Sequence, residues 1–176
     1  SANLMNSGRT YNYYTYENEV DNYQQDHYQL LFDHSFSSRW KLNMAGHYTK
    51  GRGYYEQFRQ GDELEDYGLN PVVIGGDTVL NSDVIRRRWL DNDFYGALFS
   101  MNYSKGGLNI TFGGGANNYI GDHFGEIVWA EYASNSQIRE RYYQNTSEKF
   151  ELQSYAKTTL KRNKLTYYLD LQMRHI

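Results

Sequence analysis

The feature that most constrains this chain is a regular alternation of apolar and polar residues over long segments. Between Trp40 and Tyr48, every second residue is apolar or glycine, and most of the residues between them are polar. A period of two predicts β-strands with one apolar face. The pattern is cleanest at 40–49, 108–117 and 165–174, and it recurs less regularly at 28–36, 95–103 and 150–160. A seventh, weaker strand is predicted at 9–19, where tyrosine is frequent.

The apolar rows of the six clearer strands contain no Asp, Glu, Lys or Arg. These strands run to about 11 residues, which exceeds the usual five or six and suits a tilted strand that crosses a bilayer. We therefore interpret the rows as facing lipid. The principal lipid-facing positions are Tyr28, Leu30, Phe32, Leu42, Met44, Phe99, Met101, Ile110, Phe112, Leu169 and Leu171.

The connections between the predicted strands alternate in length. Short turns are expected at 37–39, 104–107 and 161–164, and long loops at 51–91 and 118–147, the first with a helical turn near 62–67. Outer-membrane barrels have short turns on the periplasmic side and long loops outside. Aromatic residues such as Trp40 and Tyr103 stand beside the short turns, where a membrane interface places them. The pattern predicts an all-β, antiparallel, up-and-down transmembrane β-barrel segment of about seven strands, forming one domain over 1–176.

Composition narrows the class of protein further. The chain has 19 Tyr, 8 Phe and 3 Trp, no Cys, and a net charge of −3. Disordered chains are poor in aromatic residues, and the charge implies no general attraction to nucleic acid. The absence of cysteine excludes disulfides and thiolate metal sites. No segment approaches the roughly 20 apolar residues that a membrane helix needs.

Four segments resemble the barrel of TonB-dependent receptors from the Bacteroidetes. They are DHYQL at 26–30, HYTKGRGYYE at 47–56, RRRWLDNDFYG at 86–96 and NYIGDHFG at 118–125. The resemblance implies a barrel of about 22 strands, closed by a plug domain, in the outer membrane of a Gram-negative bacterium. It also implies import of a scarce, bulky solute, such as an iron–siderophore complex, haem, cobalamin or a glycan, with energy delivered by TonB.

The resemblance covers nearly the whole chain, but the chain lacks a TonB box, a plug domain and most of the strands of such a receptor. We therefore expect it to be a middle portion of the barrel domain of a longer receptor. Its expected partners are outer-membrane lipid, the plug domain, a small-molecule solute, and the TonB complex through an N-terminal region absent from this chain. No cofactor is expected.

The sharpest local feature is a run of three arginines followed by Trp89. Because alternate residues of a strand share a face, Arg86 and Arg88 would face the lumen together and bind an anionic solute, with Trp89 as a stacking platform. The alternative is pairing with acidic residues such as Asp91 and Asp93. The candidate solute-binding residues are Arg86, Arg88, Trp89, Tyr119 and His123.

Other chemistry has little support in the sequence. Asp122 and His123 lack further ligands at a helpful spacing, so no metal site is predicted. No strained elbow presents a serine nucleophile, so we expect a protein that is not an enzyme. Two other classes stay open: a complete eight-stranded barrel with a structural or adhesion role, whose extra strand would lie within 51–91, and a soluble β-sandwich binding module.

Overall fold

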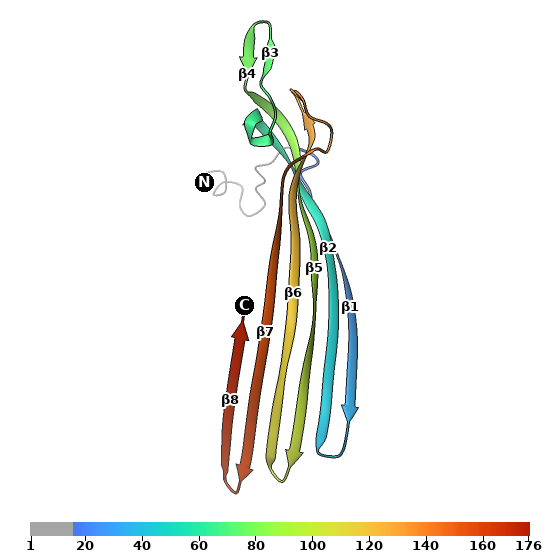
Figure 1. The fold of residues 1–176 in the computed structure, drawn as a ribbon, viewed down its shortest axis with the longest axis vertical. Helices are drawn as coiled ribbons and strands as arrows, with labels where there is room; N and C mark the ends of the chain where they lie inside the picture. The colour runs from blue at the N-terminus through green and yellow to red at the C-terminus, as the bar shows by residue number, and fades with distance from the viewer. Residues whose placement is uncertain (1–15) are drawn as a thin grey trace, which may run out of the picture. The chain divides into compact units, whose positions relative to one another are not determined.

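The computed structural model describes residues 16–176 and is all-β. Its main sheet is antiparallel and up-and-down, with six strands in the order β1-β2-β5-β6-β7-β8 (Figure 1). The strands are β1 (Asp21–Ser35), β2 (Trp40–Glu63), β5 (Asn81–Lys105), β6 (Leu108–Ala130), β7 (Arg141–Arg162) and β8 (Leu165–His175). The prediction of an all-β, up-and-down antiparallel fold is thus confirmed, and each of the six clearer predicted strands is present.

A small second sheet lies between β2 and β5 in the sequence. The 3₁₀ helix η2 (Leu64–Tyr67) follows β2, and Gly68 ends it in the left-handed region with φ 67°. The helical turn predicted near 62–67 is therefore present. Strands β3 (Val72–Ile74) and β4 (Asp77–Val79) then pair with each other and not with the main sheet. Within residues 16–176, no helix has the length and apolar character needed to cross a membrane.

The strands are longer than the sequence pattern predicted. The predicted bounds of the two long loops were therefore wrong. Strand β2 has 24 residues and β5 has 25, so the connection between them shrinks to 64–80, and the one between β6 and β7 shrinks to 131–140. In the added segments both strand faces carry polar or aromatic residues, so hydropathy no longer alternates although the strands stay paired. Of the predicted seventh strand, residues 9–15 lie outside the described part of the chain, and 16–19 form a turn.

The predicted short turns are present. Gly106 and Gly107 join β5 to β6 with φ of 56° and 83°. Two successive positive φ values define the tight hairpin turn whose twist matches that of the flanking strands, and glycine adopts them without strain. The turns after β1 and β7 also fall where the sequence predicted them, at 36–39 and 163–164.

The described chain divides into two compact units. Unit 1 comprises 16–23, Gly53–Leu90 and His123–Asn145; unit 2 comprises Gln24–Arg52, Asp91–Asp122 and Thr146–Ile176. Five strands, β1, β2, β5, β6 and β7, contribute a segment to each unit, and β1 contributes only 21–23 to unit 1. The two units differ in where their apolar side chains lie.

Unit 1 contains a small buried core. Leu64 and Val84 are at most 1% exposed, and Tyr67, Leu69 and Ile127 pack with them. The members come from η2, its following loop, β5 and β6. This core closes over one face of the strand segments of unit 1, because Val84 and Ile127 belong to the sheet while Leu64 and Leu69 come from the connection after β2.

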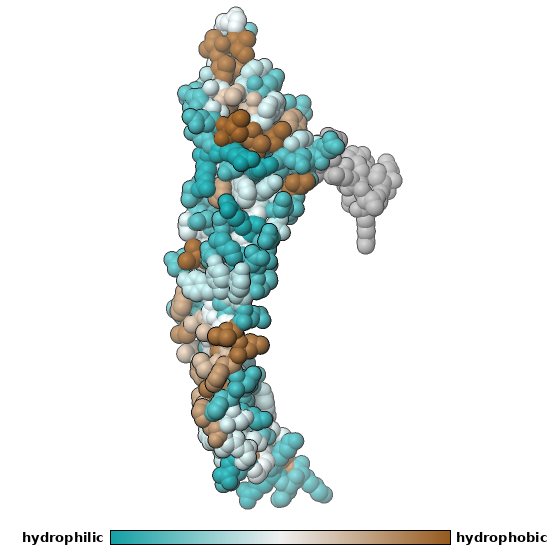
Figure 2. Space-filling view, turned by 90° about the vertical axis from the view of Figure 1, so that its right-hand side faces the viewer, coloured by the Kyte–Doolittle hydropathy of each residue, from teal (hydrophilic) through white to brown (hydrophobic). Residues whose placement is uncertain are grey.

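Unit 2 buries no apolar side chain; its buried residues are glycines. Leu30 is 76% exposed and Leu171 is 60% exposed, and hydrophobic residues are visible at the surface in Figure 2. Across β7 and β8, Ala156 faces Leu171 and Leu160 faces Tyr167, so the row continues from strand to strand. We call these outward apolar positions of 28–36, 40–48, 95–103, 108–116, 150–160 and 165–173 the apolar row.

The opposite face of unit 2 carries a ladder of polar side chains. Asn43 donates to Asp33, Asn102 Nδ2 donates to Asn43 Oδ1 at 3.1 Å, and Thr111 Oγ1 donates to Asn102 Oδ1 at 2.8 Å. The four residues come from β1, β2, β5 and β6, so one chain of hydrogen bonds crosses four strands. One face of this sheet is thus apolar and the other polar, with no second layer over either face within the described residues of unit 2.

Candidate functional site

The three consecutive arginines of β5 point to two different faces of unit 1. Arg87 lies with Glu56, to which its Nε donates at 2.7 Å. Arg86 donates instead to Gln57, and Arg88 to Tyr143. Gln57 follows Glu56 in β2, so the two partners project on opposite sides of that strand. The alternation predicted for Arg86 and Arg88 is therefore present.

Trp89 belongs to the face that holds Arg87. Its ring contacts Tyr54 at 4.6 Å and stacks on Phe124 at 5.7 Å between ring centroids, and its Nε1 donates to Glu126 at 3.0 Å. The guanidinium of Arg141 lies 3.7 Å from the centroid of Phe124. We call this group, with Arg87 and Glu56, the Trp89 cluster. Trp89 thus does not form a stacking platform beside Arg86 and Arg88.

Glu56 is the buried charge of the Trp89 cluster, with 2% of its surface exposed. Its carboxylate accepts hydrogen bonds from Arg87, from Tyr16 Oη at 2.8 Å and from Asn18 Nδ2 at 2.7 Å. Burial alone would raise the pKa of Glu56, but the three hydrogen bonds favour the charged form and lower it below its ordinary value. Glu56 therefore stays ionised and fixes the chain before β1 against β2.

Arg86 lies on the other face, among neutral oxygen atoms. Its Nη1 donates to Tyr67 Oη and its Nη2 to Gln57 Oε1, both at 3.2 Å, while its buried Nε has no partner. Tyr67 in turn donates to Asp62 Oδ2 at 2.5 Å, and Arg59 forms an ion pair with the same oxygen at 3.1 Å. Burial and the bond to Asp62 raise the pKa of the Tyr67 phenol, so it stays a donor. A carboxylate thus reaches Arg86 only through a tyrosine and is shared with Arg59.

Arg88 lies between tyrosines on the face that holds Arg86. Its Nε donates to Tyr143 Oη at 3.0 Å, and its guanidinium carbon lies 5.4 Å from the Tyr143 ring and 5.9 Å from the Tyr55 ring. Tyr142 contacts both Tyr143 and Tyr67 edge-to-face, at 5.0 and 4.8 Å. Arg86, Arg88 and their partners are therefore one connected group. We call it the arginine–tyrosine cluster: Gln57, Tyr55, Tyr67, Arg86, Arg88, Tyr142 and Tyr143.

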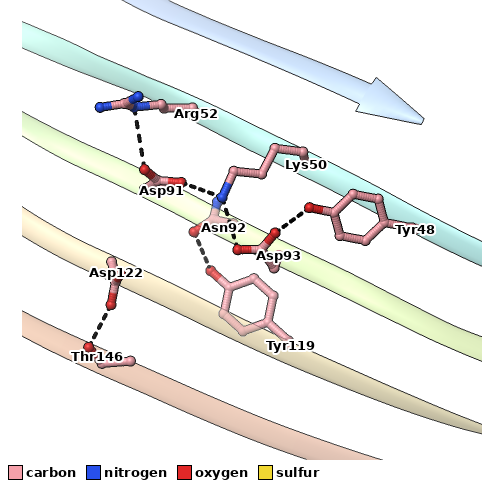
Figure 3. A network of polar contacts seen from close by, with 9 residues as sticks. All are labelled: Tyr48, Lys50, Arg52, Asp91, Asn92, Asp93, Tyr119, Asp122 and Thr146. Atoms are coloured by element: carbon pink, nitrogen blue, oxygen red, sulfur yellow. Dashed lines mark hydrogen bonds and ion pairs between the residues drawn. The ribbon is translucent and has the colours of Figure 1, made fainter. Parts of the chain in front are cut away.

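Unit 2 contains a different polar group, at the end of its apolar row. Lys50 Nζ lies 2.7 Å from Asp91 and 2.9 Å from Asp93, and Arg52 pairs with Asp91 at 3.3 Å (Figure 3). Tyr48 donates to Asp93 at 2.6 Å. Because Lys50 and Arg52 follow Tyr48 at intervals of two, they share its face of β2. The apolar row thus ends in Tyr48 and then in charges. Asp91 and Asp93 pair here and not with the arginine run. The alternative of acidic partners holds for Arg87 alone among the three arginines in the described chain, and its partner is Glu56.

The two remaining candidates lie on β6 in different units. Tyr119 in unit 2 donates to Asn92 Oδ1 at 2.8 Å (Figure 3). His123 in unit 1 is half-buried. Its neighbour Asp122 accepts a hydrogen bond from Thr146 at 2.5 Å. The described residues hold no group of three His, Cys, Asp or Glu side chains that would suit a metal ion.

Of the five candidate residues, the structure brings together Arg86 and Arg88 alone. The sequence reasoning missed Tyr55, Gln57, Tyr67, Tyr142 and Tyr143 as their neighbours. The alternation of side chains along a strand could have separated Trp89 from the two arginines, because residues 86 and 88 of β5 share a face and residue 89 lies on the other. Contact with solute stays a prediction for all five candidates.

The chain was compared with models of protein families, with curated proteins and with solved structures. No match was found in any of the three comparisons.

Proposed function

We propose that this chain is a wall segment of a transmembrane β-barrel in the outer membrane of a Gram-negative bacterium, and that the barrel belongs to a TonB-dependent receptor. The parent receptor would import a scarce, bulky solute, such as an iron–siderophore complex, haem, cobalamin or a glycan. The observation that carries the proposal is the exposed, uncharged apolar row of unit 2, on a sheet whose other face is polar.

The exposure of the apolar row supports a membrane environment. Soluble monomers seldom expose apolar patches larger than a few hundred square ångströms, yet Leu30, Phe32, Leu169 and Leu171 are all more than half exposed. The polar ladder on the opposite face suits the wet interior of a barrel, whose strands alternate apolar-out and polar-in.

The height of the apolar row also suits a bilayer. Trp40 stands at one end and Tyr48 at the other, eight residues along β2 (48 − 40). At about 3.3 Å per residue this is roughly 26 Å of strand, or about 20 Å across a membrane at a tilt near 40°. Aromatic residues at both limits, with Lys50 and Asp93 directly beyond Tyr48, are the sequence of environments expected from hydrocarbon through interface to water.

The edges of the sheet favour a larger assembly over the two alternatives. β1 and β8 are the outermost strands of the sheet, and open strand edges are not tolerated in hydrocarbon. An eight-stranded barrel would draw its extra strand from 51–91, but β3 and β4 pair only with each other. A soluble sandwich would cover the apolar row with a second sheet, whereas this row is exposed.

The proposal is tested by uptake in cells that carry or lack the intact gene encoding this chain. Labelled iron(III)–citrate, haem, cobalamin and a malto-oligosaccharide are supplied at limiting concentration. We expect uptake of one of them to fall at least about tenfold on deletion, to return with the intact gene, and to require TonB. Uptake of all four that is unchanged by deletion, or uptake that persists without TonB, would contradict the proposal.

A further inference from the structure

We infer that the arginine–tyrosine cluster of unit 1 is a binding site for an anionic solute, one that presents carboxylate, phosphate or phenolate oxygens beside an apolar or ring-bearing body. The inference rests on the proposed function and deepens it, because it selects anionic solutes over neutral glycans as the cargo.

The first support is the charge of the cluster. Arg86 and Arg88 donate to Tyr67, Gln57 and Tyr143, which are all neutral, and neither arginine forms an ion pair in the described chain. Arg87 between them has the opposite arrangement, with Glu56 at 2.7 Å. In β5, the charge of Arg87 is thus neutralised by an ion pair. The charges of Arg86 and Arg88 are not, and both lie on the other face. Arg86 is half-buried, and the nearest carboxylate in its hydrogen-bond network, Asp62, reaches it only through Tyr67. An anion bound beside Arg86 and Arg88 would add a counter-charge, which neither arginine contacts directly in the described chain.

The second support is the type of hydrogen-bonding atom left over. Arg86 Nε and Tyr142 Oη are both buried and both lack a partner in the described chain. An arginine N–H can only donate. Burial raises the pKa of the Tyr142 phenol, so its hydroxyl keeps its proton and can donate as well. The cluster therefore contains one N–H that has no acceptor and one hydroxyl that can donate to an added acceptor, and oxygen anions are strong acceptors.

The third support is access and shape. Arg88 is exposed, and its one hydrogen bond in the described chain uses Nε, so both of its Nη atoms can form the paired contact that arginine makes with a carboxylate or phosphate. Tyr55 and Tyr143 flank its guanidinium. Arg88 would then contact the anion directly. Arg86, which is less exposed and is held by Tyr67 and Gln57, would attract the anion through its positive charge. The tyrosine rings would contact the body of the solute.

The test is equilibrium binding to the intact receptor purified in detergent, with iron(III)–citrate as the anionic probe and maltoheptaose as the neutral one. Arg88→Gln is the test variant, and Arg88→Lys keeps the charge without the forked donors. Arg141→Gln is the matched control, because it removes one arginine of the same unit from the Trp89 cluster instead.

We expect the intact receptor to bind iron(III)–citrate with an affinity that falls as salt rises. Arg88→Gln should weaken this binding at least about tenfold, Arg88→Lys less, and Arg141→Gln not at all. Equal affinity in Arg88→Gln and the parent, equal losses in Arg88→Gln and Arg141→Gln, or binding of maltoheptaose alone would overturn the inference. If the receptor binds maltoheptaose alone and its uptake still requires TonB, the inference fails but the proposed function stands. If uptake does not require TonB, the proposed function itself fails.

Discussion

The two units of this chain share five strands but differ in whether their apolar side chains are buried within the chain. Unit 1 closes a small core in which Leu64 and Val84 are at most 1% exposed, whereas unit 2 leaves Leu30 and Leu171 more than half exposed. Ion pairs do not distinguish the units, because Glu56 pairs with Arg87 in unit 1 and Lys50 pairs with Asp91 in unit 2. The contrast teaches that unit 1 buries part of its apolar surface within the chain, whereas unit 2 leaves its own exposed; in the proposed barrel, lipid would cover it. The predictions that follow test this difference.

The largest effect is expected from a cavity in unit 1. Leu64→Ala should cost about 2–5 kcal/mol of the unfolding free energy, because the fully buried side chain leaves a void among Tyr67, Leu69 and Val84. Leu169→Ala in unit 2 should cost less than about 1 kcal/mol, since lipid can fill the space and no cavity forms. Urea unfolding of the intact protein in lipid vesicles measures both changes. Equal losses would mean that Leu169 is packed against protein.

A charge placed on the apolar row comes next. Leu171→Arg should destabilise the protein by about 2–4 kcal/mol in a bilayer, because arginine is costly on the lipid face of a barrel. Gln172→Arg is its matched control on the opposite face of β8, and there a charge meets water. Its effect should stay within about 0.5 kcal/mol. Folding yield and unfolding in vesicles compare the two, and a larger penalty for Gln172→Arg would reverse the assignment of faces.

The smallest of these effects concerns pH and lies in unit 1. Folding lowers the pKa of Glu56, so its carboxylate stabilises the protein above the ordinary glutamate value of 4.5, and this stability is lost as pH falls through the lowered value. Glu56→Gln should cost about 1.5–3 kcal/mol at pH 7 and should make stability less dependent on pH below 4.5. The exposed Glu65→Gln should change neither. An unaltered pH profile in Glu56→Gln would show that the buried carboxylate does not stabilise the fold.

The same contrast explains what the sequence could predict. All six strands of the main sheet were found through their unit 2 segments, where one face is apolar and alternation is visible. Five of these strands continue into unit 1, and this continuation was missed because the two faces do not differ in hydropathy there. They differ in which residues they contact: Arg87 meets Glu56, while Arg86 meets Gln57 and Tyr67. The core of unit 1 was not predicted either, since Leu64, Val84 and Ile127 come from segments far apart in the sequence.

The candidate site was predicted in part for a similar reason. The alternation of Arg86 and Arg88 follows from strand geometry alone, whereas their tyrosine partners depend on the register between β2, β5 and β7 and on the position of η2. Trp89 was grouped with them because it is adjacent in the sequence, although alternation along a strand places residue 89 on the opposite face from 86 and 88. In β5, Trp89 accordingly lies on the face opposite Arg86 and Arg88, where it contacts Tyr54 and Phe124.

The central claim is that the apolar row of unit 2 contacts hydrocarbon while the polar face contacts water. Because the chain contains no cysteine, single cysteines at 42–47 of β2 can carry a spin label in the intact protein in vesicles. The account predicts that labels at 42, 44 and 46 are relaxed mainly by oxygen, and those at 43, 45 and 47 mainly by a water-soluble nickel chelate. Equal relaxation by the nickel chelate at all six positions would contradict it.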